Sequence, residues 1–134
     1  MNKNLRIALA IIIGLVFWGI FNFASTSAIG AVWSEFGAIG RAGLETGDLS
    51  HFTLPMLLLL LAMWTWVNVA TGCLTMFIAK SRTALWCVLA ALTVFALYNH
   101  AYLYWNNLPN WYNIAVIIIF PPTVYLGSLL AKNS

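Results

Sequence analysis

The sequence predicts an all-α integral membrane protein, a single domain built as a bundle of four transmembrane helices. Of the 134 residues, 63% are hydrophobic and only 7% are charged, whereas a soluble domain carries about 25% charged residues. Four stretches are apolar over the roughly 20 residues that a helix needs to span a bilayer. The basic residues also lie mostly on one side of these stretches, as the positive-inside rule describes.

The four expected helices cover about residues 5–24, 53–79, 83–104 and 111–131. Backbone groups inside the hydrocarbon must be bonded internally, which allows only helices or a closed barrel. Uninterrupted apolar runs such as residues 57–61 lack the alternation of a barrel strand. The first stretch resembles a signal peptide in composition, but its apolar core exceeds the usual length of about 7–15 residues. We therefore interpret it as a retained helix.

The charges predict the orientation of the bundle. Basic residues stand before the first helix, between the second and third, and after the fourth: Lys3, Arg6, Lys80, Arg82 and Lys132. The other side carries Arg41 together with all three acids, Glu35, Glu45 and Asp48. The positive-inside rule then places both termini in the cytoplasm. Because nothing in the sequence indicates an organelle, we expect a multi-pass protein of the cell inner membrane.

The first outer loop, residues 25–52, has a helical pattern of its own. Its apolar residues recur at helical spacing: Ile29, Val32, Trp33, Phe36 and Ile39. This pattern predicts an amphipathic helix that lies at the outer interface of the membrane. Four glycines, at positions 37, 40, 43 and 47, weaken it by about 1 kcal/mol each relative to alanine. A loop that is only partly helical is the alternative.

Several polar side chains fall within the predicted hydrocarbon. Asn22, Asn99 and His100 lie about six residues outward of their helix centres, which is about 9 Å from the midplane. Polar groups at this depth face protein or water. They form a candidate ligand pocket together with Asn68 and the proline pair described below. In the alternative, His100 bonds Asn22 or a tyrosine hydroxyl and joins the third helix to the first.

The second helix carries a stripe of small and polar residues at helical spacing: Thr65, Asn68, Gly72, Thr75 and Ala79. Such a stripe lets helices pack closely where lipid supplies no hydrophobic driving force. It predicts an internal packing seam, or alternatively the wall of a pore with Asn68 near the midplane.

Pro121 and Pro122 stand near the middle of the fourth helix. Two prolines remove two N–H donors, so the carbonyls of Ile117 and Ile118 lose their helical partners. We expect a kink or a short unwound segment, because broken helices at the midplane line binding sites in transporters. The candidate donors that would bond the freed carbonyls are Thr123, Tyr125, Asn68 and Thr71.

We expect neither a metal nor another cofactor. The sequence has two cysteines without a CxxC pair, and a less favoured divalent-metal site would use His51, His100, Asp48 and Glu45. The six basic residues are scattered, so a nucleic-acid partner is not expected.

Enzyme signatures and charged residues inside the spans are both absent from the sequence, which argues against a proton-coupled pump. The sequence favours a non-catalytic accessory, regulatory or immunity-type component that acts through a partner membrane protein. The expected partners are the lipid bilayer and either further copies of the chain or a larger membrane complex. The alternative is a small oligomeric transporter or channel for an ion or small solute. A lipid-modifying enzyme is least favoured, because its only acid–base set would be His100 with Glu45 or Asp48.

Overall fold

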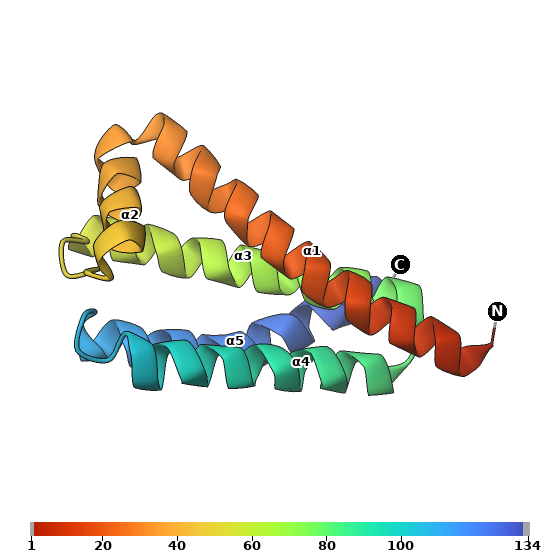
Figure 1. Cartoon of the computed structure of the whole chain (residues 1–134). Helices are drawn as coiled ribbons and strands as arrows, with labels where there is room; N and C mark the ends of the chain where they lie inside the picture. The colour runs from red at the N-terminus through yellow and green to blue at the C-terminus, as the bar shows by residue number, and fades with distance from the viewer. Residues whose placement is uncertain (1, 133–134) are drawn as a thin grey trace.

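The computed structural model describes residues 2–132 as a helical protein. The elements are α1 (Lys3–Val32), α2 (Ser34–Thr46), α3 (Leu54–Ala79), α4 (Arg82–Leu97), the π-helical segment η1 (Tyr98–Leu103) and α5 (Asn110–Lys132). Within this range four helices are long and apolar enough to cross a membrane: α1, α3, α4 with η1, and α5. Three of them run alongside one another in Figure 1, while α1 crosses the others obliquely. The predicted set of four apolar spans is confirmed.

The first helix is longer than the sequence predicted. It continues to Val32, so the expected end near residue 24 is wrong. Ser25 and Thr26 had indicated the start of a loop, but the Thr26 hydroxyl donates to the Asn22 carbonyl at 2.9 Å. A threonine whose hydroxyl bonds the preceding turn is compatible with a continuing helix. Ile29 and Val32 therefore belong to α1 and not to the helix of the outer loop.

The segment predicted to form the first outer loop does contain a helix, α2, which turns back from the end of α1 (Figure 1). Phe36 is its buried anchor, with its ring 5.5 Å from that of Phe52. The corner is tight at Gly37, where an added Cβ would lie 2.8 Å from the Gly30 carbonyl oxygen. The helix ends at Gly47, whose φ of 75° suits glycine. This corner holds α2 against the end of α1, and the Phe36–Phe52 contact joins α2 to the segment before α3.

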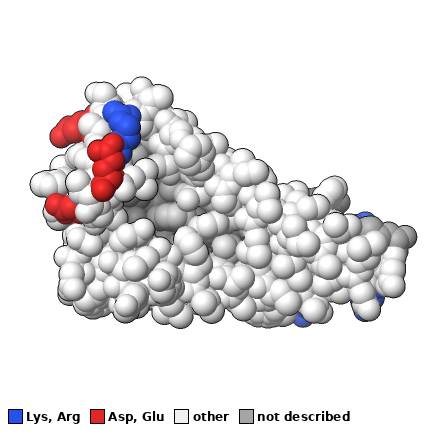
Figure 2. All heavy atoms as spheres, viewed as in Figure 1, with Lys and Arg blue, Asp and Glu red and all other residues white. Residues whose placement is uncertain are grey.

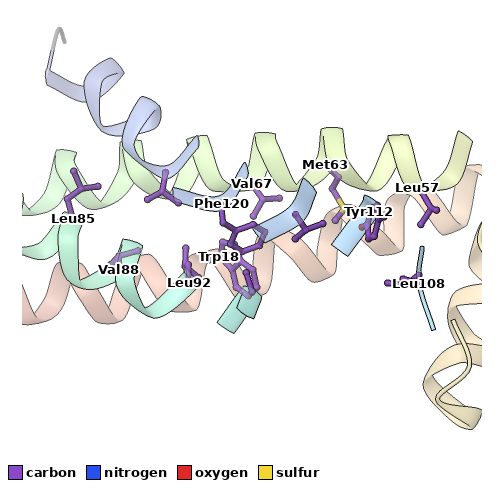
Figure 3. Close-up of a cluster of buried hydrophobic side chains, with 13 residues drawn as sticks. Trp18, Leu57, Met63, Val67, Leu85, Val88, Leu92, Leu108, Tyr112 and Phe120 are labelled. Carbon is purple, nitrogen blue, oxygen red and sulfur yellow. The ribbon is translucent and has the colours of Figure 1, made fainter. Parts of the chain in front are cut away.

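The core lies between α1, α3, α4 and α5, and Figure 3 shows apolar side chains from these helices meeting along its length. The closest approach joins α3 and α5. A Cβ on Gly72 would collide with the Val124 carbonyl, and one on Gly127 would collide with the Val69 carbonyl. The two backbones therefore touch, as small residues permit in membrane helices.

The small-residue stripe of α3 lies on buried faces of the helix, where Gly72 meets Val124 of α5 and Thr75 meets Gly14 of α1. Asn68, Gly72, Thr75 and Ala79 are buried, and Thr65 is half-buried. The arrangement is that of the predicted packing seam.

The two ends of the molecule differ in charge. Both termini lie at the end opposite α2 (Figure 1). The acidic residues gather at the α2 end, where one basic patch lies beside them (Figure 2). At the terminal end, the Arg6 Nε donates to the Ile78 carbonyl at 2.6 Å. A cation at the last turn of a helix also opposes the negative end of its dipole, so Arg6 ties the start of α1 to the end of α3.

Candidate functional site

Asn68 is the centre of a buried hydrogen-bond network that joins three helices. Its side chain is fully buried in α3. The indole N–H of Trp18 in α1 donates to the Asn68 Oδ1 at 3.0 Å. The Asn68 Nδ2 donates to the Thr123 Oγ1 of α5 at 3.1 Å. Asn68 thus bonds both neighbouring helices through opposite ends of one amide.

Aromatic rings surround this network. Trp18 stacks on Trp64 with ring centroids 5.6 Å apart, and it meets Phe95 and Phe120 edge-on at 5.0 and 6.2 Å. The Trp64 indole in turn donates to the Tyr112 hydroxyl at 3.2 Å. The polar groups of these residues bond protein partners, and apolar rings fill the space around them.

The proline pair does not break α5. The helix runs through Pro121 and Pro122 without an unwound segment, so that part of the expectation is wrong. The ribbon of α5 instead turns toward α3 in its second half (Figure 1). The Thr123 hydroxyl donates to the Ile119 carbonyl at 2.6 Å and lies 3.1 Å from that of Phe120. A hydroxyl that bonds the previous turn lets a proline-containing membrane helix continue.

The hydrogen bonds predicted for the freed carbonyls of Ile117 and Ile118 are not the ones that form. Of the four candidate donors, Thr123 bonds the carbonyls of Ile119 and Phe120 instead. The Thr71 hydroxyl bonds the Val67 carbonyl of its own helix at 2.8 Å. Among residues 2–132, hydrogen bonds from side chains to the Ile117 or Ile118 carbonyls are not found. Asn68 instead donates from its Nδ2 to the Thr123 hydroxyl. The bend of α5 after the proline pair thus coincides with the position where Thr123 bonds Asn68 of α3.

His100 belongs to a second polar cluster, at the end of the α4–α5 hairpin where η1 leads into α5. Its Nδ1 lies 2.8 Å from the Asn113 Oδ1. Because an amide oxygen only accepts, His100 carries a proton on Nδ1 in this arrangement. The Asn113 Nδ2 donates to the carbonyls of Tyr104 and Leu108 at 3.2 and 3.3 Å. The pair therefore fixes the connection between η1 and α5.

This arrangement corrects the predicted partners of His100, which were Asn22 or a tyrosine hydroxyl. His100 bonds α5 and not α1, and it meets Tyr104 and Tyr112 only through ring edges, at 5.6 and 5.8 Å. The reason is local: the π-helical turn η1, where the Tyr104 N–H donates to the Asn99 carbonyl at 2.7 Å, rotates His100 toward the hairpin partner. Asn113 was not among the predicted site residues. It is the lone amide of an otherwise apolar stretch, and this feature could have predicted that its side chain bonds other protein groups.

Asn22 and Asn99 do not join either cluster. The Asn99 Nδ2 donates to the Phe95 carbonyl of its own helix at 2.8 Å. The Asn22 Oδ1 is buried and lacks a hydrogen-bond partner within the described residues. The candidate pocket therefore separates into the Asn68 network, the His100–Asn113 pair and an isolated Asn22.

At the acidic end, His51 Nε2 lies 3.3 Å from Asp48 Oδ2, a contact that is an ion pair when His51 is protonated. Hydrogen bonds from the Ser50 hydroxyl at 2.6 Å and the Ser50 N–H at 2.9 Å hold the pKa of Asp48 below its ordinary value of 3.8, and His51 adds to this effect. Across residues 2–132, three or more His, Cys, Asp or Glu side chains do not gather into a metal-binding group. The set of His51, His100, Asp48 and Glu45 is thus not brought together.

Two hollows on the surface are lined by apolar side chains alone. One lies between α3 and the C-terminal end of α1 (named its outer end after the predicted orientation), with a volume of about 360 Å³, and is lined by Ala28, Ile29, Val32, Trp33 and Leu59. The other has a similar volume of about 360 Å³ and is lined by Ile12, Ile13, Val16, Phe17, Ile20 and Leu74. Such surfaces suit lipid chains or apolar helices and supply no acid, base or nucleophile.

Searches of protein-family models, curated proteins and solved structures found no match to this chain. The fold itself defines the class: four apolar helices of spanning length fit a multi-pass membrane protein.

Proposed function

We propose that this chain is a non-catalytic protein of the cell inner membrane that acts as an accessory, regulatory or immunity-type component through a partner membrane protein. In this proposal both termini and the basic end are cytoplasmic, and α2 lies at the outer interface. The separation of charge between the two ends supports this orientation, because cytoplasmic segments carry the excess of lysine and arginine.

The observation that carries the proposal is the exposure of α1. Only 17% of its most apolar stretch is buried, against 33% to 39% for the other three spans. One face of α1 presents a continuous apolar stripe at helical spacing: Leu5, Leu9, Ile12, Val16, Ile20 and Phe23. The hollow that includes Val16 and Ile20 adjoins this stripe. A transmembrane helix of a partner can pack along this stripe, which extends over most of a membrane span.

The buried polar residues support the same choice over transport or catalysis. Asn68, His100 and Asn113 bond other groups of the protein, so they serve to hold helices together. A transporter or channel would require Asn68 to face a solute path, and an enzyme would require His100 to face Glu45 or Asp48. Neither alternative gains an observation in its favour.

The proposal is tested by photo-crosslinking in intact cells. A benzophenone amino acid replaces Ile20 on the α1 stripe, with Ile118 on α5 as the matched control, since both side chains are 65% exposed. We expect a discrete protein adduct of reproducible mass from position 20 and only diffuse lipid labelling from position 118. Mass spectrometry of the adduct then distinguishes a second copy of this chain from a different membrane protein.

Equal results at the two positions, or lipid adducts alone at position 20, would contradict a partner on α1. Retention of the adduct after Asn68→Leu, in protein that remains folded, would further separate the partner surface from the buried network.

A further inference from the structure

The groove between α1 and α3 has the features of a binding site for a lipid chain. Its lining consists of Ala28, Ile29, Val32, Trp33 and Leu59, none of which carries a charge. The outer end of α1 stands apart from α3 beside the corner into α2 (Figure 1). The groove has a volume of about 360 Å³ and is open to its surroundings, so a chain could enter it from the side.

The position of the groove along the spans indicates which part of a lipid would enter it. Leu59 stands five residues after the first residue of α3, so it lies about 8 Å inside the helix end at 1.5 Å per residue. At this depth the surrounding medium is the upper part of the acyl chains. Among the lining side chains only the indole of Trp33 carries a hydrogen-bonding group, so a water-soluble ligand would find a single partner there.

The charges of α2 indicate the headgroup. Arg41 and Glu45 are four residues apart, and residues at this spacing are neighbours on a helix surface. Both are exposed, and Arg41 forms no ion pair with any carboxylate of the described chain. Figure 2 shows the resulting basic patch beside acidic ones at this end of the molecule. A headgroup that carries both a phosphate and an amine complements this pair, whereas a purely anionic headgroup would meet three carboxylates and one guanidinium.

We propose that the groove holds an acyl chain of a zwitterionic phospholipid of the outer leaflet, with its phosphate on Arg41 and its amine on Glu45. The indole N–H of Trp33 has no hydrogen-bond partner in residues 2–132, so it is free to donate to the ester group of such a lipid. Tryptophan is enriched at this level of a membrane because its ring is apolar and its N–H is polar. The site does not depend on a partner protein and is testable on the purified chain.

The test uses the full chain in lipid nanodiscs that contain a small fraction of a phospholipid with a photoreactive diazirine in the upper part of one acyl chain. Two probes share this chain, one with a phosphatidylethanolamine headgroup and one with a phosphatidylglycerol headgroup. We expect the ethanolamine probe to label residues 28–33 or 59 at least about fivefold more than Ile118, a ratio that corresponds to about 1 kcal/mol. The glycerol probe is expected to label the groove several-fold less.

Two variants, the first with a matched control, complete the test. Ala28→Trp fills the groove from an exposed position and should abolish the selective labelling, while Ala91→Trp, the same substitution at an exposed position of α4, should leave it unchanged. Arg41→Gln should reduce groove labelling by the ethanolamine probe about fivefold, the loss of about 1 kcal/mol. Thermal unfolding of each variant verifies that it is folded.

Uniform labelling of all lipid-facing helices would overturn the site, because it would mean that lipid contacts the groove only as bulk solvent. Equal labelling by the two probes would overturn it as well, since the headgroup would then not be recognised. Failure of the crosslink at Ile20 would count only against the partner on α1 and would leave the lipid site standing.

Discussion

The crossing of α3 with α5 and the outer end of α1 are built from similar residues but packed in opposite ways. At the crossing, Gly72 and Gly127 bring two backbones into contact, and Asn68 has both ends of its amide bonded. At the outer end of α1, an apolar groove stays open and the buried Asn22 oxygen has no partner. Hydropathy alone does not separate these regions, because both are apolar with one asparagine. The difference teaches that small residues and paired polar groups decide where membrane helices lock together.

The largest expected effect is at the crossing itself. Gly72→Ala places a Cβ against the Val124 carbonyl, so α3 and α5 must separate. Overpacking typically costs about 1–3 kcal/mol, and we expect the upper end because the obstacle is backbone. The matched control is Gly19→Ala, since an added Cβ there meets no atom within 4 Å. The free energy of unfolding, measured by titrating micelles with sodium dodecyl sulfate, should fall for Gly72→Ala and stay level or rise for Gly19→Ala. A similar response of both variants would mean that the backbones do not touch.

The next effect concerns the paired asparagine. Asn68→Leu removes two interhelical hydrogen bonds and leaves the buried Trp18 N–H without an acceptor, so stability should fall by about 1–2 kcal/mol. Thr65→Val is the control, because the half-buried Thr65 hydroxyl bonds only the Leu61 carbonyl of its own helix. The same unfolding assay applies. An Asn68→Leu protein as stable as the wild type would show that the network contributes nothing, and the solute-path alternative would regain support.

The unpaired asparagine should behave in the opposite way. Asn22→Leu removes a buried acceptor that has no partner, so stability should stay constant or rise by up to about 1 kcal/mol. Because Asn22 and Asn68 undergo the same substitution, their difference isolates the contribution of hydrogen bonding. A loss as large as that of Asn68→Leu would show that Asn22 is bonded in the membrane and that the outer end of α1 is more tightly packed than it is here.

The smallest effect is expected in the turn after α2. Hydrogen bonds from Ser50 lower the pKa of Asp48 below 3.8, so the ionised carboxylate stabilises the folded turn. A lowered folded pKa means that this contribution is present above the unfolded pKa and is lost as the pH falls through the folded value. Amide hydrogen exchange of residues 48–52 should accelerate at low pH, relative to the intrinsic rate, in the wild type. In Asp48→Asn the protection should be low and independent of pH. A wild-type profile without pH dependence would contradict this role of Asp48.

The four spans were predictable because hydropathy is a local property of about 20 consecutive residues. The end of α1 was not predictable, because Ser25 and Thr26 resemble loop residues, and only the structure shows that the Thr26 hydroxyl bonds within the helix. The packing role of the α3 stripe was predictable from its spacing of small residues. The partner of His100 was not, because the π-helical turn changes which direction the side chain faces. The open groove could not be predicted from the sequence either, because the angle between α1 and α3 is not determined by the residues of either helix alone.

The sequence by itself determined that this protein is four apolar helices with one basic and one acidic end, because the transfer of charged and apolar groups between water and lipid depends on residue type and not on neighbours. Only the tertiary structure decided which polar groups pair, where α1 is left exposed and where a groove remains. Those outcomes depend on the rotation and crossing angle of each helix, which many weak contacts set together.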